Sequence, residues 1–588
     1  MKFELVYVVP VLVIICASCA AQEVPPGFRV LGTRVPQEAE ALLIPDGFTE
    51  QLPDVNDVAP AWTKDEMDRG HVIFATHYMD PVYPRSVPLR EQITTELKMF
   101  CSRGEYEPVT FAIHALRDLT AVRVTVGNLE NSAGDVIGDA NIDVRSVRCW
   151  PKRVWKNPPA SQYTLFPWFL EKRDAIDVPG GRTRQYWLTV YVPPGSPAGT
   201  YRGMVHVKVP GTGATRLELE LQVLPISLRT PPTRHGMYYH MFDEATPLPH
   251  PTYSDAYLDK DIINMREHGM NTVFVMLYPS ISGSLNNGKV SYDLTPIASF
   301  VKTCLETGLG PGIWNMTVDD LLPAYRGPAD LGANVRGFVD SFYARNWPTP
   351  ILSFGDESDA ADPWNTVDKL GVIKAAVPEA LTYTTIVFPR NSEVGEPDLD
   401  IRAFSSYLDD AGAERTRKAG RQLWMYSGPA ESTVKANRFY RGLWGSALKL
   451  DGIMDWVYFT LYKHDQLYND LVKPRGGPNH RGWAVPTEDG PLPTLSWEGI
   501  REGIDDGRYL FTLQAMIEEA RATTNAKLKT AARQADETIS RLHAMVDAGN
   551  FGERYPLYRT CDELSVASFD EFRYQIAQHI IELQTLLE

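Results

Sequence analysis

Cysteine is scarce in this sequence, and the scarcity excludes a small scaffold held together by disulfide bonds. Six of the 588 residues are cysteine, and two of them, Cys16 and Cys19, lie in an apolar segment at the N-terminus. The other four are Cys101, Cys149, Cys304 and Cys561. Four cysteines are too few to stabilise so long a chain. A bridge between Cys101 and Cys149 and a set of unpaired buried thiols remain alternatives.

Metal-binding motifs are missing as well. The sequence has no CxxC or HExxH pattern, and its twelve histidines are scattered along the chain. Zinc sites in proteins use ligands at such short spacings. The sequence therefore indicates neither a metal site nor another cofactor.

The chain has fewer basic than acidic residues. The chain has 58 Lys and Arg against 74 Asp and Glu, a formal net charge of −16. Proteins that bind nucleic acid present a basic surface that neutralises phosphates. A nucleic-acid partner is therefore not expected, and the acidity is typical of the solvated surface of a soluble protein.

The only long apolar run stands at the N-terminus, which reads MKFELVYVVPVLVIICASCAAQEVPPG. One lysine precedes an apolar stretch from Leu5 to Ile15, and small residues follow. This stretch is shorter than the roughly 20 residues of a membrane-spanning helix, and its layout is that of a secretory signal. Residues 1–21 are therefore predicted to be a signal peptide, cleaved after Ala20 or Ala21, or before Cys19 if that residue carries a lipid anchor. We expect export without a membrane span, to the periplasm, the cell surface as a lipoprotein, or the medium.

Along the rest of the chain, the sequence pattern changes three times. Residues 22–68 are rich in proline and lack periodicity, so they are predicted to be a leader or linker on the surface. Residues 69–228 contain strand-like segments such as EPVTFAIHAL and QYWLTVYVPP between Gly, Pro and Asn breaks, without a helix-length pattern. They predict an antiparallel β-sandwich.

In residues 229–490, apolar strands alternate with helix-sized amphipathic segments. Strands are expected at 236–241, 271–277, 310–316, 349–355, 381–388, 401–407, 422–428 and 452–459. Eight strands separated in this way predict an eight-fold β/α barrel, irregular after the fifth and sixth strands, with a doubly wound open sheet as the alternative. Residues 491–588 read as helices that cap or flank the barrel.

Two adjacent acids follow the fourth expected strand, in the stretch ILSFGDESDA. Asp356 and Glu357 stand where that strand ends, and active sites of β/α barrels form at the C-terminal ends of the strands. We therefore predict both as catalytic residues. In the alternative interpretation, Asp356 caps the next helix and Glu357 faces water. The pair Asp243 and Glu244, beyond the first strand, is a rival site.

Large aromatic side chains fall near the ends of several expected strands, where barrels normally carry branched aliphatic residues. The predicted sugar-binding residues are His240, Tyr407, Trp424, Tyr426, Trp456 and Tyr458. Trp424 and Tyr426 are expected to share one face of the seventh strand, and Trp456 and Tyr458 one face of the eighth. Core packing is the alternative role for each of them.

Several long segments resemble glycoside hydrolase family 123. SRGEYEPVTFAIHA and QYWLTVYVPPGSPAGTYRGMVHV resemble its N-terminal sandwich, and FGDESD its acid pair after the fourth strand. MREHGMNTVFV, LWMYSGP, DGIMDWVYF and DGPLPTLSWEGIREGIDDGRYL resemble later segments, so the likeness runs from about residue 95 to 515. It implies a sandwich joined to a barrel, and removal of terminal β-linked N-acetylgalactosamine from a glycan.

The resemblance also implies a mechanism that suits adjacent acids. Ordinary retaining glycosidases use two carboxylates about 5–5.5 Å apart on opposite sides of the sugar, which neighbouring residues achieve poorly. In substrate-assisted hydrolysis, the sugar's own 2-acetamido oxygen is the nucleophile. Asp356 would then orient the acetamido group and Glu357 would act as acid and base. Tyr426 or Tyr407 would donate to the acetamido carbonyl, and the Trp456 ring would form a wall of the pocket around the acetamide.

Two other functions remain open at this point. A conventional retaining glycosidase would use Glu357 as acid/base and Glu431, just beyond the seventh strand, as nucleophile, and would need no acetamido group. A non-catalytic carbohydrate-binding protein on the same scaffold would bind glycans without turnover.

Overall fold

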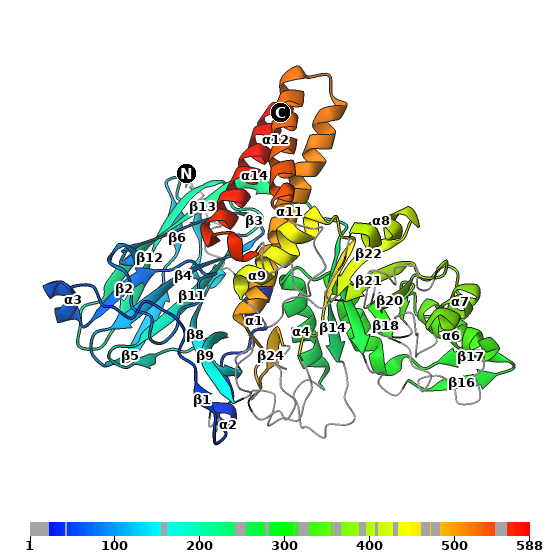
Figure 1. Cartoon of the computed structure of the whole chain (residues 1–588), viewed down its shortest axis with the longest axis horizontal. Helices are drawn as coiled ribbons and strands as arrows, with labels where there is room; N and C mark the ends of the chain where they lie inside the picture. The colour runs from blue at the N-terminus through cyan, green and yellow to red at the C-terminus, as the bar shows by residue number, and fades with distance from the viewer. Residues whose placement is uncertain are drawn as a thin grey trace, which may run out of the picture.

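Two β-structures lie side by side, and a group of C-terminal helices rises between them (Figure 1). This computed structural model describes residues 23–40, 44–153, 161–240, 254–276, 281–310, 312–315, 328–353, 355, 357, 366–386, 396–405, 408, 410–426, 433–459, 471, 482–546 and 561–588. The three parts are the expected sandwich, barrel and helical region.

The sandwich consists of two sheets. The first contains, in spatial order, β1 (Thr49–Glu50), β9 (Gln162–Glu171), β8 (Ile142–Arg153), β11 (Thr183–Tyr191), β4 (Tyr106–Ala115) and β2 (His71–Ala75). The second contains β10 (Ile176–Val178), β5 (Leu119–Val126), β12 (Gly199–Lys208), β13 (Thr215–Ser227) and β3 (Glu96–Arg103), with β6 (Leu129–Asn131) and β7 (Val136–Ile137) beside β12. The pairing is antiparallel as predicted, except that the edge strands β1 and β3 pair parallel to their neighbours.

Strict alternation explains why β13 forms a strand. Leu217, Leu219 and Leu221 are buried in the sandwich core, whereas Glu218 and Glu220 between them face outward. Side chains alternate across a strand, so this pattern places every leucine on one face. The sandwich core is built in this way from both sheets.

The barrel is closed by eight parallel strands, which excludes the open sheet. They are β14 (Arg234–His240), β15 (Thr272–Met276), β18 (Gly312–Asn315), β19 (Ile351–Ser353), β20 (Thr382–Ile386), β21 (Ile401–Ser405), β22 (Gln422–Tyr426) and β23 (Gly452–Asp455). Seven of the eight predicted segments contain the whole observed strand, and the segment at 236–241 contains all of β14 except its first two residues.

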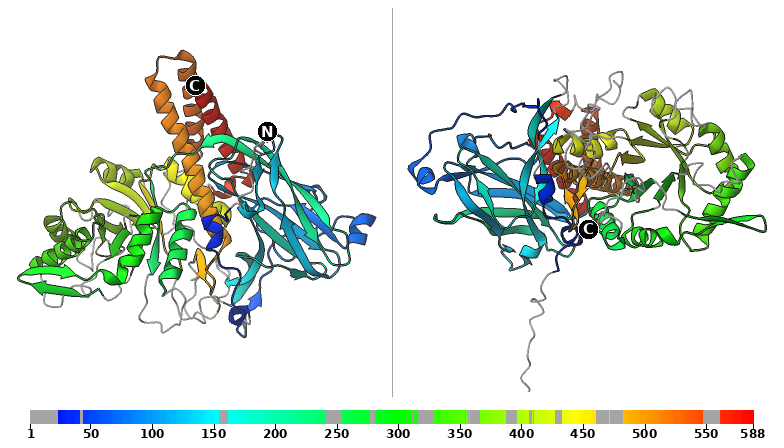
Figure 2. Two further views of the ribbon diagram at one scale, coloured as in Figure 1. Left: turned by 180° about the vertical axis from the view of Figure 1, so that it is seen from behind. Right: turned by 90° about the horizontal axis from the view of Figure 1, so that it is seen from below.

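Helices surround the strands, as the view from below in Figure 2 shows. They are α4 (Asp255–Glu267), α5 (Ala298–Thr307), α6 (Pro328–Tyr343), α7 (Thr366–Ala376), α8 (Asp410–Lys418) and α9 (Val434–Phe439), the last continuing through a π-helical turn (Tyr440–Trp444) into α10 (Gly445–Ala447). Between β20 and β21, the described residues 396–400 form a turn. The gap after β21, also predicted to be short for a full helix, contains the nine-residue helix α8. Two small hairpins, β16 (Gly283–Asn286) with β17 (Lys289–Tyr292) and β24 (Ala484–Pro486) with β25 (Pro491–Pro493), complete this part.

Three long helices form the C-terminal region: α11 (Leu495–Ala522), α12 (Ala526–Ala544) and α14 (Val566–Leu587). The first half of α11 is buried against α9, and both figures show its second half projecting with α12 and α14. Gly499 and Gly503 let α9 approach, because a Cβ on either would collide with the carbonyl oxygen of Val434 or Arg438. The buried Arg573 of α14 then ties the helices to the sandwich through its hydrogen bond to Glu107, 2.8 Å long.

The N-terminal segment differs from the predicted surface linker. Short helices occur at α1 (Pro26–Arg29), α2 (Gln37–Glu40) and α3 (Lys64–Arg69), and β1 pairs with β9. Val35 is completely buried and its N–H donates to Glu171, while the N–H of Gly32 donates to the carbonyl of Pro491. The segment thus fastens the sandwich to the β24–β25 hairpin. It escaped sequence analysis because isolated docking contacts leave no periodic pattern.

The cysteines settle one further expectation. Cys101, Cys149, Cys304 and Cys561 are all unpaired, so the alternative of free thiols is correct; three of them are buried and Cys149 is half-buried. Within the described ranges, no cluster of three or more His, Cys, Asp or Glu side chains is arranged to hold a metal ion. The same ranges contain no helix that is both long and apolar enough to cross a membrane.

Candidate active site

Glu357 lies just beyond the C-terminal end of β19, in the loop that starts at Gly355. Its backbone N–H donates to Thr385 Oγ1 over 2.5 Å, and Ser405 Oγ donates to its Oε1 over 3.3 Å. Thr385 and Ser405 face the barrel interior, because Tyr383 and Ala403, two positions earlier on β20 and β21, pack there. The two neighbouring strands therefore hold the backbone of Glu357 and contact its carboxylate at the mouth of the barrel, where the residue is exposed, as the alternative interpretation also expected.

The backbone of this loop is unusual. Gly355 has φ 107°, and Glu357 has φ 45°, in the left-handed region that residues with a Cβ rarely adopt. A non-glycine residue there costs of order 1–3 kcal/mol, and such residues cluster at functional sites where surrounding contacts hold them. The hydrogen bond to Thr385 is such a contact. In this conformation the Glu357 carboxylate accepts from Ser405.

Ser353, the last residue of β19, adds a free hydroxyl at the same end. It is fully buried, and its Oγ has no hydrogen-bond partner. Ile351, two residues earlier, packs inside the barrel, so Ser353 also faces inward. An unpaired buried hydroxyl is costly, and a polar group of a bound ligand would satisfy it.

Aromatic rings fill the barrel below this mouth. Tyr238 stacks on Phe274 with centroids 4.1 Å apart, and its hydroxyl lies 2.8 Å from that of Tyr383. Tyr426 lies 5.0 Å from the Tyr238 ring. The floor of the barrel is therefore largely apolar, and the hydroxyl groups of Tyr238 and Tyr383 are hydrogen-bonded to each other, as buried tyrosines usually are.

Trp424 and Tyr426 share the interior face of β22, as predicted, but they lie at different depths. Trp424 is only 1% exposed; its Nε1 donates to Gln422, and its ring occupies the space that a side chain on Gly452 would need. Trp424 is therefore part of the floor and does not reach the mouth. Tyr426 ends the strand and pairs in register with Ser405, the residue that holds Glu357.

Trp456 and Tyr458 do not share a face, contrary to the prediction. The strand β23 ends at Asp455, so the alternation assumed for 452–459 stops there, and the peptide bond after Trp456 is cis. Trp456 is half-buried and lies 5.4 Å from the Tyr238 ring, at the barrel mouth. Tyr458 is completely buried outside the barrel, where its hydroxyl donates to Asn264 of α4 over 2.8 Å. Tyr458 is therefore a packing residue.

Some predicted residues lie outside the described part of the chain. They are Asp356, Tyr407, Glu431, Asp243 and Glu244. His240 ends β14, where its backbone pairs with Met276, and its side chain also lies outside the description.

Buried charges behind the strands support the site. Arg441 of the π-helical turn donates to Asp455 and to the carbonyl of Ile453, which fixes β23 immediately before Trp456. Burial lowers the pKa of His235 well below its usual value, and the neighbouring Arg441 lowers it further, so this histidine is neutral at pH 7. Further along β14, Tyr239 donates to Asp261 over 2.8 Å, and burial raises the pKa of that carboxyl to about 8.

The sequence analysis missed Ser353, Thr385 and Ser405. Their signal was present: each is a small hydroxyl residue at or next to the end of a predicted strand, in phase with an interior apolar residue. Small polar residues are common in any sequence, so only the position in the barrel distinguishes these.

Comparison with known proteins agrees with this architecture. The glycoside hydrolase 123 N-terminal domain family matches residues 78–209. A solved family 123 glycoside hydrolase from Clostridium perfringens superposes with a TM-score of 0.64, covering 88% of this chain and 99% of that one at 13% identity. The chain resembles the glycoside hydrolases of family 123. The likeness to the solved family 123 enzyme shows a shared fold across sandwich, barrel and helices.

Other comparisons carry no weight. A xyloglucanase from Bacteroides ovatus, at 10% identity, covers 71% of this chain and 99% of that chain with a TM-score of 0.30. A β-glucuronidase from Bacteroides uniformis, at 11% identity, covers 71% and 48% with a TM-score of 0.29. No curated protein matches the sequence.

Proposed function

We propose that this protein is an exported glycoside hydrolase that removes terminal β-linked N-acetylgalactosamine from glycans. The observation that carries the proposal is the setting of Glu357, held by Thr385 and Ser405 at the mouth of an aromatic-floored barrel. Active sites of β/α barrels occupy this end of the fold. The likeness to family 123 supports the choice of a glycosidase.

Glu357 serves as general acid and then as general base in the proposed reaction. The 2-acetamido oxygen of the sugar attacks C1 while Glu357 gives its proton to the departing glycosidic oxygen, so the C1–O bond breaks and an oxazolinium forms. Glu357 then takes a proton from water, which attacks C1 and opens the ring. Two inversions at C1 give net retention, and the carboxyl group ends protonated again.

Ser405 positions the acid. Because its hydroxyl donates to Oε1 of Glu357, the proton of the carboxylic acid is directed to Oε2, the oxygen left for the leaving group. Thr385 fixes the backbone from which the side chain extends. Precise placement of a catalytic group contributes to rate because misplacement by about 1 Å can cost 10²-fold.

The acetamido group is recognised by the neighbouring residues in this proposal. Asp356 accepts the acetamido N–H and stabilises the positive oxazolinium, a role assigned from its place in the sequence. Tyr426, in register with Ser405, donates to the acetamido carbonyl, with Tyr407 as the other candidate donor. Trp456, half-buried at the mouth, packs against the acetamide.

The substrate follows from the same comparison. The family 123 enzyme from Clostridium perfringens acts in glycolipid glycan hydrolysis. We propose that the present protein likewise acts on the non-reducing ends of exported or extracellular glycans, because residues 1–21 have the layout of a secretory signal. Mass spectrometry of native material should find a mature chain that begins near residues 19–22, and an intact Met1 would refute export.

The mechanism is tested by the products and by an inhibitor. Proton NMR during hydrolysis of an aryl β-N-acetylgalactosaminide should show the β-anomer first. A thiazoline shaped like the bicyclic intermediate should inhibit strongly, since a site built for the intermediate binds its stable analogue tightly. A covalent glycosyl adduct on Glu431 would favour the conventional retaining mechanism, and glycan binding without any turnover would favour a carbohydrate-binding protein.

A further inference from the structure

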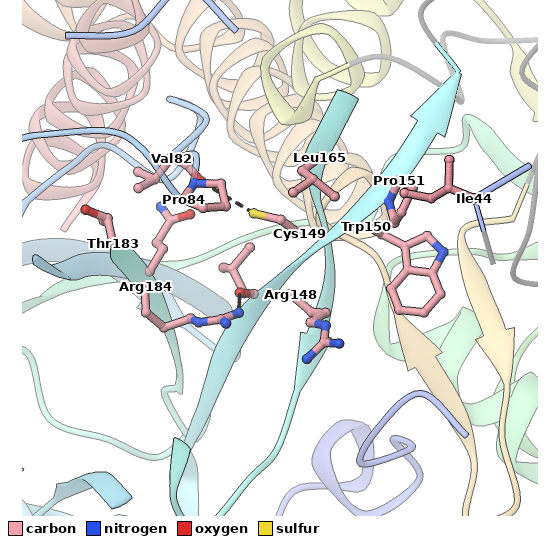
Figure 3. Close-up of a pocket in the computed structure, with 12 residues that line it drawn as sticks. Ile44, Val82, Pro84, Arg148, Cys149, Trp150, Pro151, Leu165, Thr183 and Arg184 are labelled. Carbon is pink, nitrogen blue, oxygen red and sulfur yellow. Dashed lines mark hydrogen bonds between the residues drawn. The ribbon is translucent and has the colours of Figure 1, made fainter. Parts of the chain in front are cut away.

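A pocket opens at one end of the first sandwich sheet, where β8 and β11 separate. Their pairing ends at Tyr186 and Ser146, although both strands continue beyond. The cavity between them has a volume of about 400 Å³ (Figure 3). Among the residues that the structure describes, its lining comes from the sandwich and the segment before it, without a barrel strand.

Two arginines dominate the polar lining of this pocket. Arg148 and Arg184 each stand two residues beyond the last strand pair, which places them on the same face of the sheet. Arg184 donates to the carbonyl of Val147 over 2.8 Å, and the Arg148 guanidinium lies 5.9 Å from the Trp150 ring. Figure 3 shows Arg148 and Trp150 extending to one side of β8 and Cys149 to the other. Neither guanidinium forms an ion pair with any carboxylate in the described part of the chain.

The surroundings increase this unbalanced positive charge. A second hollow of about 310 Å³ shares Arg184 with the first and adds Arg85 and Arg182, against the single carboxylate of Glu50. Four arginines therefore line the two hollows in a chain whose net charge is −16. Burial lowers the pKa of Arg184, and the nearby Arg148 lowers it further. A bound anion would offset both effects.

Gln185 gives a second, independent indication of a ligand. It lines the same pocket and is 2% exposed, with its Nε2 donating to Thr76. Its Oε1 is buried and accepts no hydrogen bond. An unsatisfied buried acceptor costs about 1–3 kcal/mol, which a ligand hydroxyl would recover by donating to it. Because Gln185 is next to Arg184 on β11, its side chain points to the opposite face of the sheet. The pocket thus offers a site for an anionic group on one side of the separated strands and for a hydroxyl on the other.

We propose that this pocket binds an acidic saccharide, with Arg148 and Arg184 holding its carboxylate or sulfate group. Arginine suits this task because its planar guanidinium pairs with two oxygens of such a group at once. The choice of a saccharide rests on the proposed function, whereas the anion site stands on the sandwich alone. The sandwich would then hold the enzyme on glycans that carry acidic residues.

Isothermal titration of the full mature chain tests the proposal. The probes are a glucuronate-containing disaccharide, 4-sulfated N-acetylgalactosamine, neutral N-acetylgalactosamine and inorganic sulfate. We expect saturable binding of at least one acidic sugar, weakened by added salt because ion pairs are screened, and no comparable binding of the neutral sugar at this site. If inorganic sulfate binds and none of the sugars does, the pocket holds an adventitious ion only and the proposal is overturned.

Three variants localise the binding. Arg148→Gln and Arg184→Gln should each weaken the acidic sugar at least tenfold. Arg123→Gln removes the same charge from an exposed position on β5 in the other sheet and should leave binding unchanged. Equal affinity in wild type, Arg148→Gln and Arg184→Gln would refute the assignment.

Folding and activity are controlled separately. Because Arg184 also bonds to Val147, its variant is judged by melting temperature, and Arg148→Gln decides if Arg184→Gln proves unstable. Hydrolysis of a small aryl glycoside should be the same in Arg148→Gln and wild type. If the protein binds an acidic sugar but hydrolyses no glycoside, the proposed function is wrong and this pocket assignment still stands.

Discussion

Ser405 Oγ lies 3.3 Å from Glu357 Oε1 and donates a hydrogen bond to it, joining the end of β21 to the loop after β19. The contact crosses over β20, the strand between them, whose Thr385 holds the backbone of the same glutamate. Three adjacent strands thus define where one carboxylate points. This arrangement assigns Ser405 a positioning role that can be measured.

Ser405→Ala should lower kcat by about tenfold on substrates with poor leaving groups and leave KM nearly unchanged. A hydrogen bond to a charged group contributes about 1.5–3 kcal/mol, and part of it is recovered by water. Steady-state kinetics measures the effects on kcat and on KM separately. Ser284→Ala, on the exposed β16 hairpin, is the matched control and should behave as wild type. A drop in melting temperature with unchanged kcat would show a structural role instead.

Glu357→Gln should lower the rate by about 10²–10⁴ on substrates with poor leaving groups, the usual range for losing a general acid/base. Aryl substrates with acidic phenols leave without a proton, so their first step should suffer less. Pre-steady-state kinetics separates this step from the second. Asp243→Asn and Glu244→Gln should be milder, and equal severity in all three would favour Asp243 and Glu244 as the catalytic pair.

Trp456 and Tyr458 should separate into binding and packing roles. Trp456→Leu should raise KM for acetamido sugars several-fold with little change in melting temperature, because the half-buried ring faces the mouth. Tyr458→Phe should leave KM unchanged and lower stability by about 1 kcal/mol, since it removes one of the two buried donors to Asn264 Oδ1, the other being Trp497 Nε1. Kinetics and denaturant unfolding of both variants test this. The reverse pattern would place Tyr458 in the site.

The outcome for these two aromatics shows what sequence periodicity can and cannot determine. Apolar segments between helix-sized gaps were sufficient to predict all eight barrel strands, because burial on both faces of a parallel strand leaves a distinct apolar run. The point at which β23 ends was not encoded in that pattern. The residues of its extension were therefore placed on the wrong faces.

The site itself was only partly predictable for a similar reason. The acid at 357 stood out because a buried strand ended on it. Thr385 and Ser405 contact it from strands 28 and 48 residues away in sequence, respectively, and a single sequence carries no sign of such a contact. The docking of Val35 in the N-terminal segment was hidden in the same way.

Asp261 should make stability depend on pH. Its pKa is about 8 in the folded protein against an ordinary value of 3.8, so the folded state keeps a proton that the unfolded state loses first. Its contribution to stability is therefore full below about pH 3.8 and is lost as pH rises through about 8. Asp261→Asn stays neutral and keeps an acceptor for Tyr239. The free energy of unfolding of the variant, relative to that of the wild type, should therefore rise by up to about 1.4 kcal/mol per pH unit within this window.

Urea unfolding at a series of pH values measures the difference. Asp259→Asn, on the same helix but bonded to Thr303 of α5, serves as control and should run parallel to wild type. If Asp261→Asn also runs parallel to wild type between pH 4 and 8, Asp261 is ionised in the folded protein and the account of its burial is wrong.

The most direct test of the central claim compares two substrates that differ only at C2 of the sugar. We expect aryl β-N-acetylgalactosaminides to be hydrolysed with retention and the matching β-galactosides to be nearly inert, because only the former carry their own nucleophile. The ratio of kcat/KM for the pair is the decisive quantity, and it should exceed about 10³, the scale on which losing a catalytic group is felt. Comparable turnover of the two substrates would contradict substrate-assisted catalysis and would mean that a protein side chain is the nucleophile.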